Sequence, residues 1–115
     1  EPILVGRQSL VDDMARPAPG KTGSGLLVSS YLEPVPQFIP LENLTVTTSP
    51  EALGGCDVVL VCTKSAQSHE AGQLIAKFAS ADALVVSFQN GTANPATLRE
   101  AVRPTQTVLA GMVEF

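Results

Sequence analysis

Four short runs of apolar residues divide the chain and predict buried strands. They are rich in Val and Leu, lack polar alternation, and cover Ile3–Val5, Val58–Cys62, Leu84–Phe88 and Val108–Val113. A strand with one wet face alternates polar and apolar residues, whereas uninterrupted runs are typical of strands covered on both faces, as in parallel sheets. We therefore expect an α/β fold with a mostly parallel sheet and helices on both of its faces.

Two segments between the last three runs carry helical signals. In residues 65–80 the apolar positions recur at spacings of three and four, which predicts an amphipathic helix. Those positions are Ala71, Leu74, Ile75 and Phe78. The second segment begins with Asn94-Pro95, a capping residue before a proline at the first helical position, and ends before Pro104. The order from residue 57 onward is then strand, helix, strand, helix, strand, with right-handed crossovers.

The first half of the chain is less regular. Ser49 can cap a helix that begins at Pro50, and Gly54-Gly55 can end it, so we expect a short helix from Pro50 to about Leu53. The prolines of residues 16–40 exclude a long helix and predict an irregular excursion with a hairpin or edge strand at Gly25–Tyr31. We expect the chain to rejoin the sheet at Leu44–Thr47, and a mobile loop stays an alternative for Pro17–Ser24.

The composition limits the function classes. With 115 residues, 44% hydrophobic and 16% charged, the chain is a globular domain or part of one. A net charge of −4 without a Lys/Arg cluster argues against nucleic acid as a partner. No apolar stretch approaches the roughly 20 residues that span a bilayer, and no signal peptide is visible, so we expect a cytoplasmic protein without a membrane partner. Cys56 and Cys62 lack the spacing of a metal site and are expected to be buried reduced thiols.

Candidate chemistry lies where the predicted strands end, because open α/β sheets bind ligands at the carboxyl ends of their strands. Arg7 follows the first strand, where an arginine can pair with the 2′-phosphate of NADP and an acidic residue would favour NAD. A surface arginine is the alternative. Lys64 opens a helix, where the dipole disfavours a cation, which favours a ligand or a carboxylate partner beside it. A solvated lysine is the alternative.

A carboxamide pair, Gln89-Asn90, ends the next strand before Gly91. Asn-Gly is a common turn pair, so a plain turn is the alternative to a binding site. If the strands are parallel, Lys64 and Asn90 lie on one edge of the sheet and can reach one ligand. His69, the single histidine, is expected to be solvated or packed on its helix.

These motifs resemble those of the ketopantoate reductase family. The segment Asp57–Gln67, with Lys64-Ser65 near its end, is similar to the family's Asp-hydrophobic-Lys-Ser-x-Gln segment, and Gln89-Asn90-Gly91 looks like its Gln-Asn-Gly segment. Val5-Gly6-Arg7 and Leu109-Ala110-Gly111 resemble the ends of two further strands. The resemblance covers essentially the whole chain, and only loosely residues 16–40.

The resemblance implies that residues 1–115 form a partial, Rossmann-like NADP-binding domain. It implies that Arg7 recognises the adenosine 2′-phosphate, that Lys64 lies near the nicotinamide half, and that Asn90 contacts cofactor and substrate. Gln67 is a weaker candidate in the same crevice. The Gly-rich loop expected before Glu1 and the helical domain with the family's proton-donating lysine are not in this sequence. None of its residues is therefore expected to be catalytic, and the chain alone is not expected to catalyse.

For the complete protein, the resemblance implies reduction of 2-dehydropantoate to pantoate by NADPH, in pantothenate and coenzyme A biosynthesis. The expected partner is a small 2-keto acid, and a homodimer is considered as well. Three alternatives stay open: reduction of another 2-keto acid, a non-catalytic nucleotide-binding domain, and a fragment held together by a partner chain.

Overall fold

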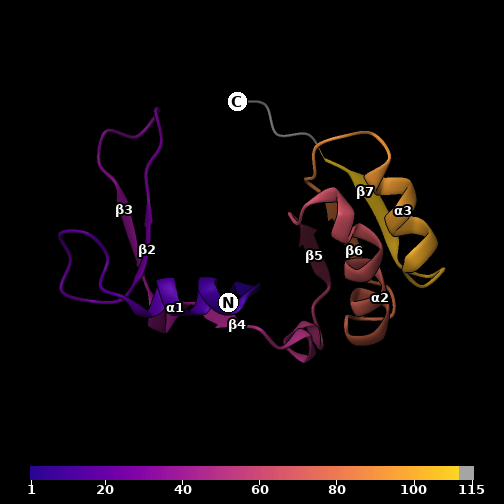
Figure 1. Ribbon diagram of the computed structural model, residues 1–115, viewed down its shortest axis with the longest axis horizontal. Helices are drawn as coiled ribbons and strands as arrows, with labels where there is room; N and C mark the ends of the chain where they lie inside the picture. The colour runs from indigo at the N-terminus through magenta and orange to yellow at the C-terminus, as the bar shows by residue number, and fades with distance from the viewer. Residues whose placement is uncertain (112–115) are drawn as a thin grey trace. The chain divides into compact units, whose positions relative to one another are not determined.

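A computed structural model describes residues 1–111 of the chain. Two compact units, Glu1–Ala52 and Leu53–Phe115, make up the chain (Figure 1). The elements of the first unit are β1 (Ile3–Val5), α1 (Gln8–Ala15), β2 (Gly25–Val28), β3 (Gln37–Pro40), the 3-10 turn η1 (Leu41–Asn43), β4 (Thr45–Thr47) and most of the 3-10 turn η2 (Pro50–Leu53). Those of the second are β5 (Val58–Val61), the 3-10 turn η3 (Ser65–Gln67), α2 (Ser68–Phe78), β6 (Leu84–Ser87), α3 (Asn94–Ala101) and β7 (Thr107–Ala110).

The first unit combines a parallel strand pair with a hairpin. β1 pairs with β4 in parallel, and β2 pairs with β3 antiparallel. The predicted hairpin and the return of the chain to a strand near Thr45 are thus confirmed. Pro17 and Ser24 form an isolated antiparallel bridge, and Ser24 Oγ donates to the carbonyl oxygen of Ala15 at 2.6 Å, so the loop between them is closed at its base.

Helix α1 was not anticipated from the sequence. It has no side-chain cap and no acidic residue in its first turn, so the local signals for a helix start are weak. Its buried residue is Met14, one turn after the partly buried Leu10. This spacing of four is the signal that would have indicated the helix, whose stability comes mainly from packing of that face.

The second unit is a three-stranded parallel sheet in the order β5-β6-β7. Its strands lie in register, so that Val61 pairs with Ser87 and Ser87 with Ala110. The predicted order of strand, helix, strand, helix, strand is confirmed. The last strand ends at Ala110, and the Met112–Val113 part of the predicted run lies outside the described residues.

Both helices of this unit cover the same face of its sheet (Figure 1). Val59, Val85 and Val108 stand side by side on that face and share one core cluster with Ile75 of α2 and Leu98 of α3. The reason is topological. Two successive right-handed crossovers that move in the same direction across a sheet place both of their helices on one side.

Within the second unit, α2 and α3 leave the opposite face of the sheet uncovered, whereas the apolar runs predicted helices on both faces. Val58, Leu60 and Leu109 point to this face and are 57%, 59% and 47% exposed. Uninterrupted apolar sequence shows that both faces of a strand suit burial, but the direction of the crossovers decides which face receives the helices.

Helices α2 and α3 approach each other closely at Gly72. A Cβ atom at this position would lie 2.6 Å from the Cβ of Ala101, closer than real Cβ contacts. We expect Gly72→Val to lower the free energy of unfolding by about 1–3 kcal/mol, because an extra side chain overpacks the helix contact. Urea unfolding followed by circular dichroism measures the change.

The matched control is Gln73→Val, which adds the same side chain at the next, exposed position. Its effect should stay within about 0.5 kcal/mol. Equal stability of the Gly72 variant and the unaltered chain would contradict the close helix contact.

Candidate functional site

An open hollow of about 360 Å³ lies where β5 and β6 end. Its lining comes from the two segments that leave these neighbouring strands: Cys62, Thr63, Lys64, Ser65, Phe88, Gln89 and Asn90. Since β5 and β6 are adjacent and parallel, their carboxyl ends meet at one edge of the sheet. The structure therefore brings Lys64 and Asn90 to one hollow, as the predicted parallel topology requires.

The lining offers one cation and several neutral hydrogen-bonding groups, with no acidic side chain. Lys64 is exposed and forms no ion pair in the described part of the chain. Its carbonyl oxygen accepts the N–H of Gln67 at 2.9 Å and so begins η3. The carboxylate partner considered from the sequence is not found among residues 1–111, which leaves the ammonium available to an anionic ligand.

Asn90 has an exposed side chain and lines the hollow, while its main-chain carbonyl oxygen is hydrogen-bonded to two other side chains. Its carbonyl oxygen accepts hydrogen bonds from Asn94 Nδ2 at 2.6 Å and from Ser65 Oγ at 3.2 Å. Gly91 follows with φ +95°, a conformation that favours glycine, and the chain bends at Asn90 and Gly91.

Gln89 is not an exposed amide of the kind expected beside Asn90. It is 9% exposed, and its Nε2 donates to the carbonyl oxygen of Thr63 at 3.0 Å and to Ser68 Oγ at 2.8 Å. Its Oε1 accepts from Ser87 Oγ at 3.2 Å. Gln89 therefore ties the segment after β6 to the segment after β5.

Ser68 and Asn94 continue this buried polar connection, which the sequence did not reveal. Ser68, fully buried, donates to Asn94 Oδ1 at 2.9 Å, and Asn94 Nδ2 donates to Ser65 Oγ at 3.0 Å. Asn94 was expected to cap α3, but Ala93 occupies the cap position and no side chain caps this helix. The expectation was wrong because partners distant in sequence take both ends of the Asn94 amide.

Three further residues differ from expectation. Gln67 is exposed in η3 and is not among the residues that line the hollow. Cys62 is exposed in the lining and Cys56 is partly buried, so the prediction of buried thiols was wrong, although both residues remain thiols. The physical reason for Cys62 is its place just beyond the end of β5, where core packing has ceased.

Arg7 lies in the first unit, directly after the carboxyl end of β1. It is exposed and occupies the N-cap position of α1, with its carbonyl oxygen accepting the N–H of Leu10 at 2.9 Å. The preceding Gly6 donates its N–H to the carbonyl oxygen of Thr47 at 2.9 Å, which extends the β1–β4 pairing up to the arginine. Among residues 1–111 Arg7 forms no ion pair, so its guanidinium at this strand end is available to an anion.

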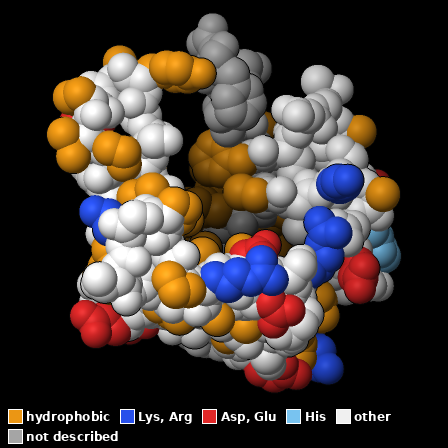
Figure 2. Space-filling view, turned by 60° about the vertical axis from the view of Figure 1, so that its left-hand side comes forward, with side chains coloured by type: hydrophobic (Ala, Val, Ile, Leu, Met, Phe, Trp, Pro, Cys, Tyr) orange, Lys and Arg blue, Asp and Glu red, His pale blue; other side chains and the backbone are white. Residues whose placement is uncertain are grey.

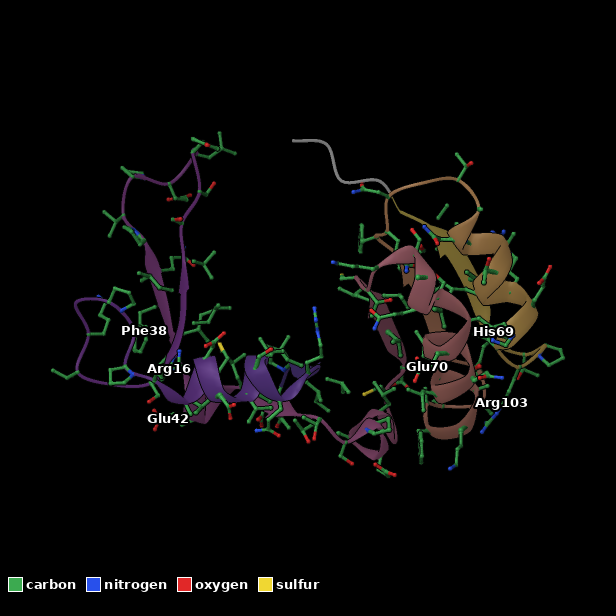
Figure 3. All side chains as sticks on the ribbon, viewed as in Figure 1. Arg16, Phe38, Glu42, His69, Glu70 and Arg103 are labelled. Atoms are coloured by element: carbon green, nitrogen blue, oxygen red, sulfur yellow. The ribbon has the colours of Figure 1, made fainter. Side chains whose placement is uncertain are left out.

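His69 projects from α2 and is exposed, as expected for a solvated histidine (Figure 3).

On the face that Figure 2 shows, Lys and Arg side chains are interspersed with Asp and Glu side chains. Within residues 1–111, no helix is both long and apolar enough to cross a bilayer, and no group of three or more His, Cys, Asp or Glu side chains could hold a metal ion.

Comparisons with known proteins agree with the motifs. The family model described as "Ketopantoate reductase PanE/ApbA" matches residues 26–115. A 2-dehydropantoate 2-reductase of Halobacterium salinarum is 37% identical over 67 residues, which make up 58% of this chain and 22% of that protein. A crystal structure of a PanE/ApbA family ketopantoate reductase from Ralstonia eutropha JMP134 has a TM-score of 0.70 at 26% identity, over 94% of this chain and 32% of that one. The chain thus spans less than a third of each relative, and the Rossmann-like α/β fold is confirmed.

Proposed function

The chain belongs to the ketopantoate reductase family, and on that premise we propose that it is part of an NADPH-dependent reductase that converts 2-dehydropantoate to pantoate. The family is one of oxidoreductases. We further propose that the enzyme uses NADPH, acts on 2-dehydropantoate in the cytoplasm, and is active only as the complete protein.

One observation carries the proposal: Lys64 and Asn90 line a single hollow at the carboxyl ends of neighbouring parallel strands. Open α/β sheets bind dinucleotides at such an edge. The groups present suit an anionic ligand, since the lining holds a cation without a carboxylate partner among the described residues, the exposed amide of Asn90 and two hydroxyls, and no acid.

NADPH would supply the hydride, and the residues of this chain would bind and orient. Arg7 is proposed to pair with the 2′-phosphate through its planar guanidinium. Lys64 is proposed to lie beside the nicotinamide half, and the Asn90 amide to hydrogen-bond both cofactor and substrate. Gln67, which does not line the hollow, is the weakest of the proposed contacts. No residue of this sequence is assigned the proton-donating role, which we place elsewhere in the complete protein.

The test is NADPH oxidation by the complete protein, followed by absorbance, with 2-dehydropantoate and with 2-keto acids of other chain lengths. We expect kcat/KM to be highest for 2-dehydropantoate. Lys64→Ala and Asn90→Ala should each lower kcat/KM by about 10- to 150-fold, the equivalent of 1.5–3 kcal/mol for a hydrogen bond that involves a charged group. If both residues hold one ligand, the double variant should lose less than the product of the two single losses.

Lys77→Ala is the control, because Lys77 is an exposed cation near the end of α2, outside the hollow. It should leave kcat/KM unchanged. A higher kcat/KM for another 2-keto acid would reassign the substrate. Tight NADPH binding without turnover of any keto acid would favour a nucleotide-binding domain over an enzyme.

A further inference from the structure

We propose that Asn94 is a positioning residue for the hollow: it holds the main chain of Asn90 so that the Asn90 side chain stands in a set relation to Lys64. This inference rests on the proposed function. Asn94 itself is 5% exposed and is not among the residues that line the hollow. It acts through the two hydrogen bonds that its Nδ2 donates, one to the Asn90 carbonyl oxygen and one to Ser65 Oγ.

The hydrogen bonds determine a single orientation of the Asn94 amide. Its Oδ1 accepts from Ser68 Oγ, and the two hydrogens of Nδ2 go to Ser65 Oγ and to the carbonyl oxygen of Asn90. In the reversed orientation an amide oxygen would face that carbonyl oxygen at 2.6 Å, with two acceptors in contact and no hydrogen between them. The Asn94 amide must therefore donate hydrogen bonds to Asn90 and Ser65 and accept one from the buried Ser68.

The other side of the Asn94 amide is anchored in the core of the second unit. Ser68 is fully buried and accepts a hydrogen bond from Gln89, which in turn holds the carbonyl oxygen of Thr63. In the described residues, every buried side-chain nitrogen and oxygen has a hydrogen-bond partner. A fully satisfied buried network of this kind is rigid and favours one arrangement of the groups that it joins.

Asn94 holds the loop after β6 at the residue that precedes a glycine. Gly91, with φ +95°, directly follows Asn90, and glycine permits many backbone conformations. Two donors, Asn94 Nδ2 and Ser65 Oγ, converge on the one carbonyl oxygen that precedes it. Since Ser65 adjoins Lys64, this junction fixes the backbone on both sides of the hollow at once.

The experiment compares two isosteric replacements in the complete protein, Asn94→Asp and Gln106→Glu. Gln106 is also 5% exposed, its Nε2 donates to the carbonyl oxygens of Ser80 and Ile75, and its Oε1 accepts the N–H of Arg103. It precedes β7, so it lies at the amino end of the sheet, away from the hollow. Both variants replace a buried amide donor by a carboxyl group, and both should reduce stability.

Only Asn94→Asp should alter the reaction. We expect its kcat with 2-dehydropantoate to fall by about ten- to a hundredfold, since small misplacements of a group that orients the reactants have effects of this size. The KM for NADPH should change less than kcat, because the proposed contact of Arg7 with the 2′-phosphate is left unaltered. Gln106→Glu should keep both parameters. An equal fall of kcat in the two variants would overturn the positioning role and leave a structural one.

A second measurement judges the inference without activity. The Gly91 N–H belongs to the same peptide group as the Asn90 carbonyl oxygen, so its nuclear magnetic resonance signal reports on that oxygen. This signal should shift in Asn94→Asp and stay in place in Gln106→Glu. An unmoved Gly91 signal in Asn94→Asp overturns the inference. If the unaltered protein reduces no keto acid while the Gly91 signal shifts as expected, the proposed function fails and the positioning of Asn90 stands.

Discussion

Replacing Leu98 with alanine should lower the free energy of unfolding by about 2–5 kcal/mol, the range measured for removal of large buried side chains. Leu98 is fully buried and belongs to the cluster that joins α2 and α3 to the sheet. One of its methyl groups lies 3.6 Å from where a Cβ of Gly72 would be, so its loss opens a void at the helix contact. Urea unfolding followed by circular dichroism gives the change.

Leu109→Ala provides the matched control for the other face of the same sheet. Leu109 is 47% exposed, so its truncation should change the stability by no more than about 0.5 kcal/mol. The difference between the two variants measures how much of the core lies under the helices. Similar losses for Leu98→Ala and Leu109→Ala would show that the exposed face of the sheet is covered in solution.

Arg7→Ala should change the choice of cofactor. If Arg7 binds the 2′-phosphate of NADP, its removal should weaken NADPH binding by about 1.5–3 kcal/mol, or roughly 10- to 150-fold, because a hydrogen bond between charged groups is lost. Binding of NADH, which has no 2′-phosphate, should hardly change. Calorimetric titration of the complete protein with each cofactor measures both effects.

Arg16→Ala is the control from the same unit. Arg16 lies exposed at the end of α1 (Figure 3). It pairs with Asp13 at 2.9 Å, so its charge already has a partner. Its removal should leave the binding of both cofactors unchanged. An equal loss of NADPH and NADH binding in Arg7→Ala would show that Arg7 does not distinguish them.

The sequence by itself determined the order of strands and helices from residue 57 onward and the strand ends whose polar residues line the hollow. Both are local properties. An apolar run of four to six residues indicates a strand, and a spacing of three and four indicates a helix, whatever lies around them. Because the alternating order predicts parallel strands, it also places Lys64 and Asn90 at one edge of the sheet before any coordinate is known.

Only the tertiary structure decided which polar residues support that edge. The hydrogen bonds among Gln89, Ser68, Asn94 and Ser65 join residues that lie 21 to 29 positions apart in the sequence. No local sequence pattern indicates that residues so far apart are in contact. Asn94 therefore looked like a helix cap, since a cap is the best partner that its near neighbours offer.

The exposure of individual side chains was likewise decided by the tertiary structure. The strand sequence marks Val58 and Leu60 as fit for burial on either face, but the shared direction of the two crossovers places α2 and α3 on the face of Val59. Helix α1 depends on packing in the same way, because its ends carry no side-chain cap and its apolar face is short. Propensity acts through neighbours in sequence, whereas burial and long-range hydrogen bonds depend on neighbours in space.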